Sequence, residues 1–350
     1  MPRLRLSLIV AVALLATAAP TASAAKNDLK VMVRNVYLGA DLIPLASATN
    51  RDEFERAAAQ RYETVQRNDF ATRAKALARE IRKHKPDVIG VQEAAVWRRG
   101  PDGIKDGSAT PANQVVYDST ELLLQELANL GQRYRVVAGR DWFDFEAPTA
   151  LGFDVRLTQR DVILGRRGSK VKFGRTLRGG YRDTFDVPTQ VGVARSPRGY
   201  VGVDAKLGRK KFRFVTTHLE AYSPAIAEKQ MNQLLAGPLK SKKRRSILVG
   251  DFNSDPKAAG GDRDAERTPS AYAAAIAKGF KNPLKRRETC CFAEDLRQTG
   301  EALDQWIDHV LVRPRTKAVG SAIVGSRSSE RLGGLWPSDH AGIVATLRLR

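Results

Sequence analysis

The sequence is poor in cysteine, which excludes several classes of small exported and zinc-binding proteins. Only two of its 350 residues are cysteine, and they are neighbours, Cys290 and Cys291. A disulfide framework needs cysteine pairs spread along the chain, so none is expected here. A thiolate metal site would also need further Cys or His residues nearby. The two thiols can close a ring with each other, or one can be buried as a free thiol; the sequence leaves both open.

Long apolar runs are scarce as well. The one at the N-terminus, Leu6 to Ala18, follows two arginines, is too short to span a bilayer comfortably, and precedes the Ala-x-Ala sequence at residues 22–24. This order is typical of a secretory signal peptide. We therefore predict that residues 1–24 are removed on secretion to the extracellular space; the alternative is an uncleaved anchor. Residues 25–350 contain no repeat and no long linker, and we expect them to form one domain without a transmembrane segment.

Acidic residues are much fewer than basic residues. The chain has 59 Lys or Arg and 38 Asp or Glu residues, a formal net charge of +21. Such a balance favours polyanionic partners: nucleic acid, the head groups of phospholipids, or a phosphorylated small molecule. The alternative is that an Arg-rich proteome or solubility explains the charge.

What the sequence does contain is a set of polar residues at the ends of apolar strands. The most informative stretch is Ile247 to Gly250, an apolar run that reads as a buried strand, followed by Asp251 and Asn253. Residues two apart in an extended chain point the same way, so a carboxylate and an amide project together. Such a pair suits a hard cation and a phosphoryl oxygen. The alternative is an Asx-rich turn after a strand.

Other predicted strands also end in, or carry, polar residues. A helical pattern over 51–85, with a break near residues 68–69, stops before Pro86 and leads to a strand that ends at Glu93. The remaining positions, each ordinary by itself, are Asn35, His218, Asp308, Asp339 and His340.

Three further segments carry weaker predictions. The acidic and aromatic run Asp141 to Glu146 is expected to be a loop near the working face, able to stack on a base, meet lipid, or form a local core. Residues 98–111 are expected to form a surface loop. Arg156 and Arg160 are candidate phosphate contacts, with ion pairs to neighbouring aspartates as the alternative.

Taken in order, five motifs resemble one family. They are PDVIGVQE at 86–93, THL at 217–219, GDFN at 250–253, IDHV at 307–310 and SDH at 338–340. This set resembles the endonuclease/exonuclease/phosphatase superfamily, which includes deoxyribonuclease I, sphingomyelinases and inositol polyphosphate phosphatases. The resemblance implies an α/β (α+β) fold: a four-layer sandwich of two packed, mostly antiparallel β-sheets flanked by helices, as in deoxyribonuclease I.

The resemblance also implies roles for single residues. Glu93 resembles the principal metal ligand, with Asn35 beside it, and Asp339 resembles a further carboxylate on the metal side. The catalytic set is then His218, Asp251, Asn253, Asp308 and His340. In it, Asp251 and Asn253 orient the water and hold the phosphate, and His218 contacts the phosphate or assists the leaving oxygen. His340 is the general base or an electrostatic partner, held by Asp308.

The chemistry of these residue types agrees with a cation. Oxygen ligands suit Mg²⁺ or Mn²⁺, and a divalent cation reduces the repulsion between a phosphodiester and an attacking hydroxide. One departure from the family pattern is that no acidic residue stands two positions after Asn35, so Asp41 is considered as a substitute. His309 follows Asp308 and is expected to be a neighbour, not a catalyst.

We therefore predict a secreted, monomeric, Mg²⁺-dependent hydrolase that attacks phosphodiester bonds with water, as an endonuclease or exonuclease. The alternatives are a sphingomyelinase-like phospholipase C, a phosphatase, or a binding module of the same fold without turnover. The choice between Asp251 and His340 as the general base stays open at this point.

Overall fold

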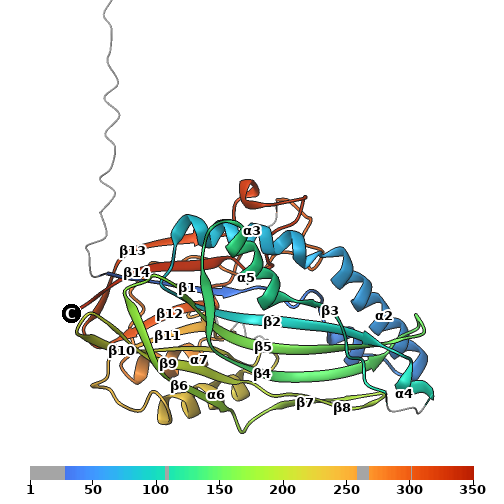
Figure 1. Ribbon diagram of the computed structural model, residues 1–350. Coiled ribbons are helices and arrows are strands. Elements are labelled where there is room, and N and C mark those ends of the chain that lie inside the picture. Colours follow the sequence, from blue (N-terminus) through green and yellow to red (C-terminus); the bar gives the residue numbers. More distant parts are fainter. Residues whose placement is uncertain (1–27, 107–109, 258–267, 301) are drawn as a thin grey trace, which may run out of the picture.

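The computed structural model describes residues 28–106, 110–257, 268–300 and 302–350, which form two β-sheets packed face to face with helices outside them (Figure 1). The predicted signal peptide lies outside the described residues. Within these ranges no helix has both the length and the apolar composition that a membrane crossing requires.

The first sheet, sheet A, has the strand order β13-β14-β1-β2-β5-β4, with β3 paired to β2. Its strands are β1 (Asp28–Asn35), β2 (Val88–Gly100), β3 (Gln114–Asp118), β4 (Tyr134–Pro148), β5 (Asp154–Arg166), β13 (Thr316–Val324) and β14 (Gly342–Leu349). Sheet B has the order β12-β11-β10-β9-β6. Its strands are β6 (Val171–Gly180), β9 (Gly199–Leu207), β10 (Lys210–His218), β11 (Ser246–Asp251) and β12 (Asp308–Arg313). A separate hairpin pairs β7 (Phe185–Thr189) with β8 (Gly192–Ser196).

The helices are α1 (Ile43–Ala46), α2 (Arg51–Arg67), α3 (Phe70–His84), α4 (Gly103–Asp106), α5 (Ser119–Asn129), α6 (Pro224–Ala236) and α7 (Ser270–Ala277), with a 3₁₀ turn at Ser328–Glu330. The helical pattern over 51–85 breaks where predicted, between α2 and α3. Asn50 and Asp69 cap the two helices, because their side chains accept hydrogen bonds from backbone amides in the first turns.

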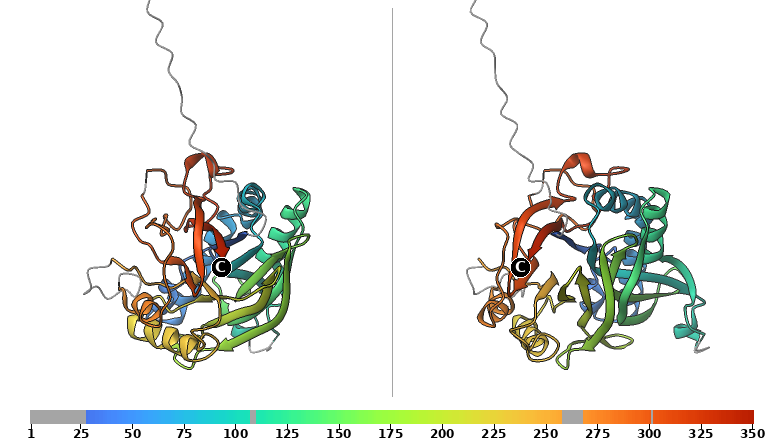
Figure 2. Two further views of the ribbon diagram at one scale, coloured as in Figure 1. Left: turned by 90° about the vertical axis from the view of Figure 1, so that its left-hand side faces the viewer. Right: turned by 60° about the vertical axis from the view of Figure 1, so that its left-hand side comes forward.

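Four layers result from the distribution of apolar side chains. The inner faces of both sheets share one core, which includes Val33, Ile163, Phe214 and Val249. Helices α3 and α5 cover the outer face of sheet A, and α6 and α7 cover the outer face of sheet B. The views in Figure 2 show these two helical layers on opposite sides of the sheets. The predicted sandwich is confirmed.

Each sheet contains one parallel strand pair, and this determines where the polar strand ends meet. In sheet A, β1 runs parallel to β2, and Asn35 pairs with Gln92. In sheet B, β10 runs parallel to β11, and His218 pairs with Asp251. The antiparallel β12 then places Asp308 opposite Asp251. The parallel strands therefore deliver their polar terminal residues to one edge of the sandwich.

Two local predictions are wrong. Residues 141–146 are not a loop but the middle of β4, where Phe143 and Phe145 pack into an apolar cluster with Trp97. Part of the expected loop at 98–111 belongs to β2, which continues to Gly100, and to α4. Long strands with exposed polar positions explain both errors, since the apolar runs are short.

A buried ion pair joins α3 to the site edge of sheet A. Arg34 and Glu80 are almost fully buried, with 3.1 Å between Nε and Oε2. The Arg34 guanidinium also donates to the backbone carbonyls of Asn35 and His340. This one side chain therefore holds the backbone at two of the polar strand ends.

We expect Arg34→Met to destabilise the protein by roughly 3–5 kcal/mol, because it leaves the Glu80 carboxylate buried without its partner. Urea unfolding followed by circular dichroism measures the change. Arg67→Met is the matched control: its partner Glu63 is 3.7 Å away and both side chains are more than half exposed, so the loss should stay below about 1 kcal/mol. Equal unfolding midpoints for the two variants would contradict the structural role of Arg34.

Candidate active site

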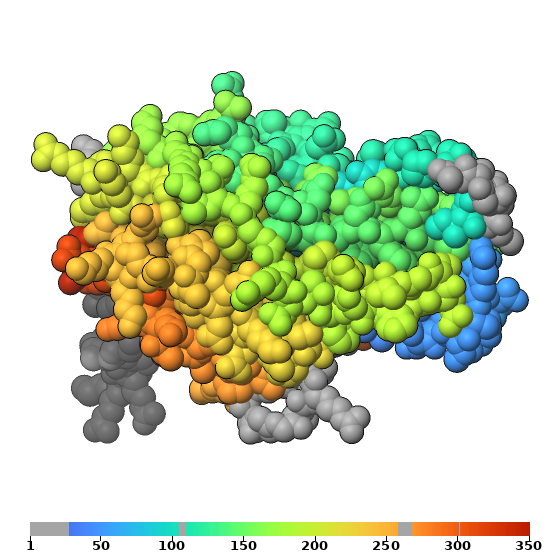
Figure 3. Space-filling view, turned by 90° about the horizontal axis from the view of Figure 1, so that it is seen from below, coloured from blue at the N-terminus to red at the C-terminus, as the bar shows by residue number. Residues whose placement is uncertain are grey.

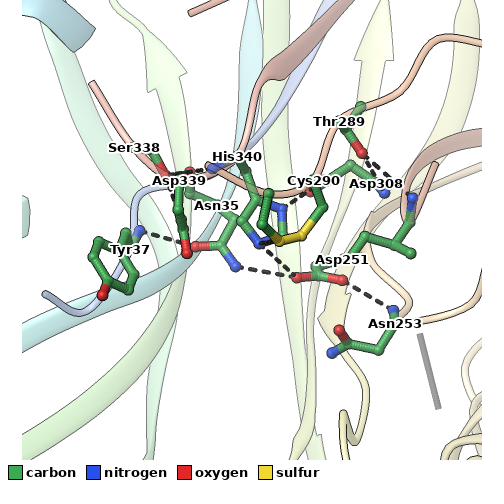
Figure 4. The surroundings of a disulfide bond; sticks show 12 residues. Asn35, Tyr37, Asp251, Asn253, Thr289, Cys290, Asp308, Ser338, Asp339 and His340 are labelled. Atoms are coloured by element: carbon green, nitrogen blue, oxygen red, sulfur yellow. Dashed lines mark hydrogen bonds and ion pairs between the residues drawn. A yellow bond between two sulfur atoms is a disulfide. The ribbon is translucent and has the colours of Figure 1, made fainter. Parts of the chain in front are cut away.

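A pocket of about 250 Å³ lies where the carboxyl ends of β1, β10 and β11 meet. Figure 4 shows the central side chains. The residues that line the pocket and were predicted from the sequence are Glu93, His218, Asp251, Asn253, Asp339 and His340.

Asp251 lies at the centre of the polar cluster. Its Oδ1 accepts the backbone N–H of Asn253 at 2.9 Å, and its Oδ2 accepts the Asn35 amide at 3.1 Å. The same Oδ2 is 3.6 Å from Nε2 of His218 and 3.7 Å from Nε2 of His340. One buried carboxylate oxygen therefore faces two imidazole rings.

The residue before Asp251 must be glycine. Gly250 has φ +147°, and a Cβ at this position would lie 1.9 Å from the Thr217 carbonyl oxygen.

His218 is oriented by donors on one side. Its Nδ1 lies 2.9 Å from the Arg198 guanidinium and 3.5 Å from the Gln159 amide nitrogen. Both groups only donate, so Nδ1 accepts and the proton of the neutral ring is on Nε2, facing Asp251. Burial and the charges of Arg198 and His340 lower the pKa of His218 well below its usual range.

His340 is held by a carboxylate. Its Nδ1 lies 2.8 Å from Oδ2 of Asp308. Burial disfavours charge on the ring, but Asp308 and Asp339 outweigh it, and the pKa of His340 lies well above its usual range. Asp308 is the first residue of β12. This carboxylate–imidazole pair fixes the ring orientation.

Glu93 reaches the pocket through a backbone irregularity and not through a strand end. The pairing of β2 with β5 shifts between Val91 and Ala94, and Glu93 has φ +57°. Such a bulge re-aims a side chain, and a non-glycine residue at positive φ is uncommon. The Glu93 carboxylate accepts the Leu38 amide at 2.8 Å and the Asn35 amide at 3.0 Å.

Asn35 connects the carboxylates in a way that differs from its predicted role as a metal ligand. Its Oδ1 accepts the backbone N–H of Tyr37 at 2.9 Å, which fixes the amide orientation. The amide nitrogen therefore faces Glu93 and Asp251, and a nitrogen that donates to carboxylates is not a cation ligand. In this arrangement Asn35 orients the two carboxylates.

The electrostatics of the cluster fit a divalent cation. Burial and the charge of Asp308 raise the pKa of Asp251 to about 8. Burial, with a contribution from Glu93, raises the pKa of Asp339 to about 6. One oxygen of Asp308 is buried without a hydrogen-bond partner. Ligand atoms of Asp251, Asp308 and His340 lie within 4.8 Å of one another. Crowded oxygen donors of this kind suit a hard cation, which would favour their ionised forms.

Cys290 and Cys291 form a disulfide with each other beside this cluster. Their sulfur atoms lie 3.7 and 3.9 Å from Nε2 of His340. The sequence left open a ring closed by the two cysteines or a buried free thiol, and the structure has the disulfide-closed ring. Both sulfur atoms therefore lie beside the Nε2 edge of the buried imidazole.

Several residues around the site were not singled out from the sequence. Arg198, the residue before β9, and Gln159 of β5 contact His218, and Tyr222 lines the pocket. Arg73 is buried and donates to the carbonyls of Val36 and Pro337, at 2.7 and 3.2 Å. No motif marks these residues, since only the pairing of distant strands brings them to the site.

Arg156 and Arg160 do not line the pocket. Arg156 forms a two-bond pair with Asp144 at 2.7 and 2.6 Å, and Arg160 binds Asp118 at 2.8 Å. The prediction that they contact phosphate is not supported. Both arginines form ion pairs, as the alternative proposed, but their partners are not the aspartates next to them in sequence.

Asp41 lines the pocket, and its carboxylate accepts the Ile43 amide at 2.9 Å. His309 is buried among aromatic rings and its Nε2 lies 3.0 Å from the Ser254 carbonyl, as expected for a structural residue.

Comparisons with known proteins agree with the family that the motifs resemble. The profile of the Endonuclease/Exonuclease/phosphatase family matches residues 65–340. No curated protein sequence matches the chain. Among solved structures, a mannosyl-6-phosphatase of Bacteroides thetaiotaomicron superposes with a TM-score of 0.55 at 15% identity, covering 91% of this chain and 99% of that one.

Two further solved structures are similar in fold. TDP2 of D. rerio, complexed with a single strand DNA product, gives a TM-score of 0.51 at 17% identity, over 92% of this chain and 99% of that one. An endonuclease/exonuclease/phosphatase from Beutenbergia cavernae gives 0.54 at 17% identity, over 93% and 72%. At these identities the likeness concerns the fold.

We expect Mg²⁺ or Mn²⁺ to raise the melting temperature of the purified protein, because a ligand that binds only the folded state stabilises it by mass action. Glu93→Gln should remove most of the shift, since it takes one negative charge from the cation site. Differential scanning fluorimetry with increasing metal concentration measures this. Glu63→Gln, on the exposed face of α2, is the control and should keep the full shift. An unchanged shift in Glu93→Gln would reject Glu93 as a ligand.

Proposed function

Because the chain belongs to the endonuclease/exonuclease/phosphatase family, a family of phosphoesterases, we propose that it hydrolyses phosphodiester bonds with the help of a divalent cation. The observation that carries the proposal is the position of Asp251. One of its oxygens faces two imidazole rings at 3.6 and 3.7 Å and receives the Asn35 amide at the wall of a 250 Å³ pocket.

The cation would be Mg²⁺ or Mn²⁺, and Glu93 and Asp339, with Asp251 beside them, would hold it. When bound, it offsets negative charge on the phosphoryl group and on the leaving oxygen. Family members are generally dependent on divalent metals, and the crowded carboxylates support the same dependence here.

Asp251 is the group that accepts the proton of the attacking water. The alternative, Nε2 of His340, is enclosed by Asp251 at 3.7 Å and by two sulfur atoms at 3.7 and 3.9 Å, which leaves little room for a water molecule. His340, oriented by Asp308, lines the pocket and instead stabilises negative charge on the phosphate through the positive charge of its ring, without direct contact. General base help of this kind contributes roughly 10²–10⁴ in rate.

His218 binds the phosphate from sheet B, and Asn253 orients the water. The Nε2–H of His218 points into the pocket, because its Nδ1 accepts from Arg198. The Asn253 amide nitrogen donates to the Leu219 carbonyl at 2.9 Å, and this leaves the amide oxygen on the pocket side for the water. Arg198 is a positioning residue that also adds positive charge behind His218.

Nucleic acid is the substrate class that the charge supports best. The net charge of +21 favours a polyanion, and one structural neighbour holds a single strand DNA product. A phosphatase is the second candidate, since another neighbour is a mannosyl-6-phosphatase. A sphingomyelinase-like phospholipase C and a binding module without turnover are the remaining alternatives. The signal-like residues 1–24 support secretion.

Purified protein should hydrolyse bis-p-nitrophenyl phosphate in the presence of Mg²⁺ and lose this activity in EDTA. Asp251→Asn and His340→Ala should each lower kcat by at least about 10². Asp295→Asn, an exposed residue outside the pocket, is the control. Retained turnover in a folded Asp251→Asn protein would reject the mechanism, and activity unaffected by EDTA would reject the cation.

A substrate panel should then separate the candidates. We expect single-strand DNA or RNA to be cleaved faster than sphingomyelin or the monoester p-nitrophenyl phosphate, measured as kcat/KM at fixed salt. Cleavage of nucleic acid should fall steeply as salt rises, because phosphate contacts release counterions. Preference for the monoester would instead favour the phosphatase.

A further inference from the structure

A second, larger hollow of about 820 Å³ lies at the end of sheet B that is remote from the candidate active site. It is bounded by the start of β6, the β9–β10 turn and the segment before β11. Lys210 and His218 begin and end β10, so the two sites are about 26 Å apart along that strand, at about 3.3 Å per residue. Figure 3 shows the face on which α6 and α7 lie, with the β9–β10 end of the molecule at left.

The residues that line this hollow are strongly basic. Ten are Lys or Arg, and one, Asp204, is acidic. The chain as a whole has 59 basic and 38 acidic residues, so overall composition does not explain the ratio here. The hollow is therefore more basic than the chain as a whole.

Three of the lysines form a row across neighbouring strands. Lys172 of β6 pairs with Lys206 of β9, and Lys206 pairs with Lys211 of β10. The adjacent residues Ala205 and Phe212 pack into the core between the sheets, so the lysine row lies on the outer face of sheet B. Adjacent strands are about 4.8 Å apart, and like charges directly opposite each other destabilise a sheet.

The one carboxylate that lines the hollow, that of Asp204, does not neutralise the lysine row. Asp204 is already bound by both arms of the Arg213 guanidinium, at 2.7 and 2.8 Å, and Arg244 approaches it only to 3.4 Å. Burial and the charge of Arg315 lower the pKa of Arg245. The folded protein therefore carries unfavourable repulsion here, which a bound polyanion would relieve.

The shape and chemistry of the hollow favour a phosphate chain over a membrane. None of the described large apolar side chains that are exposed to solvent lines it, and peripheral membrane binding generally uses such side chains. Its volume is that of a small-molecule site, which suits a few nucleotides of one strand. It offers no exposed aromatic ring for stacking, since Phe173 is half-buried and Phe212 is buried.

We propose that this hollow binds the phosphate backbone of a nucleic-acid strand, without base preference, at a site separate from the active site. The lysine row and the arginines around it contact successive phosphates. The inference does not depend on the hydrolytic activity proposed above, since it concerns binding alone.

The test is fluorescence anisotropy of a labelled 20-nucleotide thymidine strand with Asp251→Asn protein in EDTA, so that no cleavage occurs. The variant with Lys172→Gln, Lys206→Gln and Lys211→Gln should bind at least tenfold more weakly. The slope of log K against log salt should fall by about 2, at about 0.7 per lost contact. Urea unfolding should show the variant to be no less stable, since it removes repulsion.

The matched control removes three exposed charges from α3, with Lys75→Gln, Arg79→Gln and Arg82→Gln, and should leave affinity and slope unchanged. Equal losses in both variants would show general charge attraction and overturn the proposal, as would no loss in either. A large difference between thymidine and adenosine strands would overturn backbone recognition. Tighter binding to phosphatidylserine vesicles than to the strand, lost in the lysine-row variant, would show that the hollow is a membrane site.

Discussion

The hydrogen bond between the Asn35 amide and the Asp251 carboxylate, at 3.1 Å, joins the two sheets at the candidate active site. Asn35 ends β1 in sheet A, and Asp251 ends β11 in sheet B. The site exists only because the two sheets are packed so that these strand ends meet. The same amide binds Glu93 at 3.0 Å, so one side chain sets the separation of two negative groups. A cluster with several buried carboxylates is unfavourable by itself, and this is the physical reason to expect a cation in it.

Support for that contact comes from buried arginines. Arg34 bonds to the backbone of Asn35 and His340 and is paired with Glu80. Arg73 holds the segments at Val36 and Pro337. Burying a guanidinium is costly unless every donor finds an acceptor. These side chains therefore fix the loops on both sides of the pocket.

The sandwich was predicted from the resemblance of the five motifs to the family. Several residues of the central polar set were predicted because apolar strands that end in His218 and Asp251 have a clear local pattern. The sequence did not predict how Glu93 reaches the pocket, since a bulge inside a longer strand leaves no mark in an apolar run. Arg198 was missed for a different reason. It precedes β9 and meets His218 only through strand pairing, which no local motif encodes.

The basic hollow could not be predicted from local sequence patterns either. Lys172, Lys206 and Lys211 are far apart in sequence, and only the register of β6, β9 and β10 aligns them. Net charge indicated a polyanion but not where it would bind. In the structure, the polar ends of the sheet B strands contribute to the candidate catalytic pocket, while the opposite ends of β6, β9 and β10 line the basic hollow.

The most direct test of the account is a crystal of this protein soaked in Mn²⁺ and measured at the manganese absorption edge. The account predicts an anomalous peak in the 250 Å³ pocket, at bonding distance from a Glu93 oxygen and close to Asp251. A peak elsewhere, or none in the pocket of a well-occupied crystal, would contradict the claim that the junction of the two sheets is a cation-dependent hydrolytic centre.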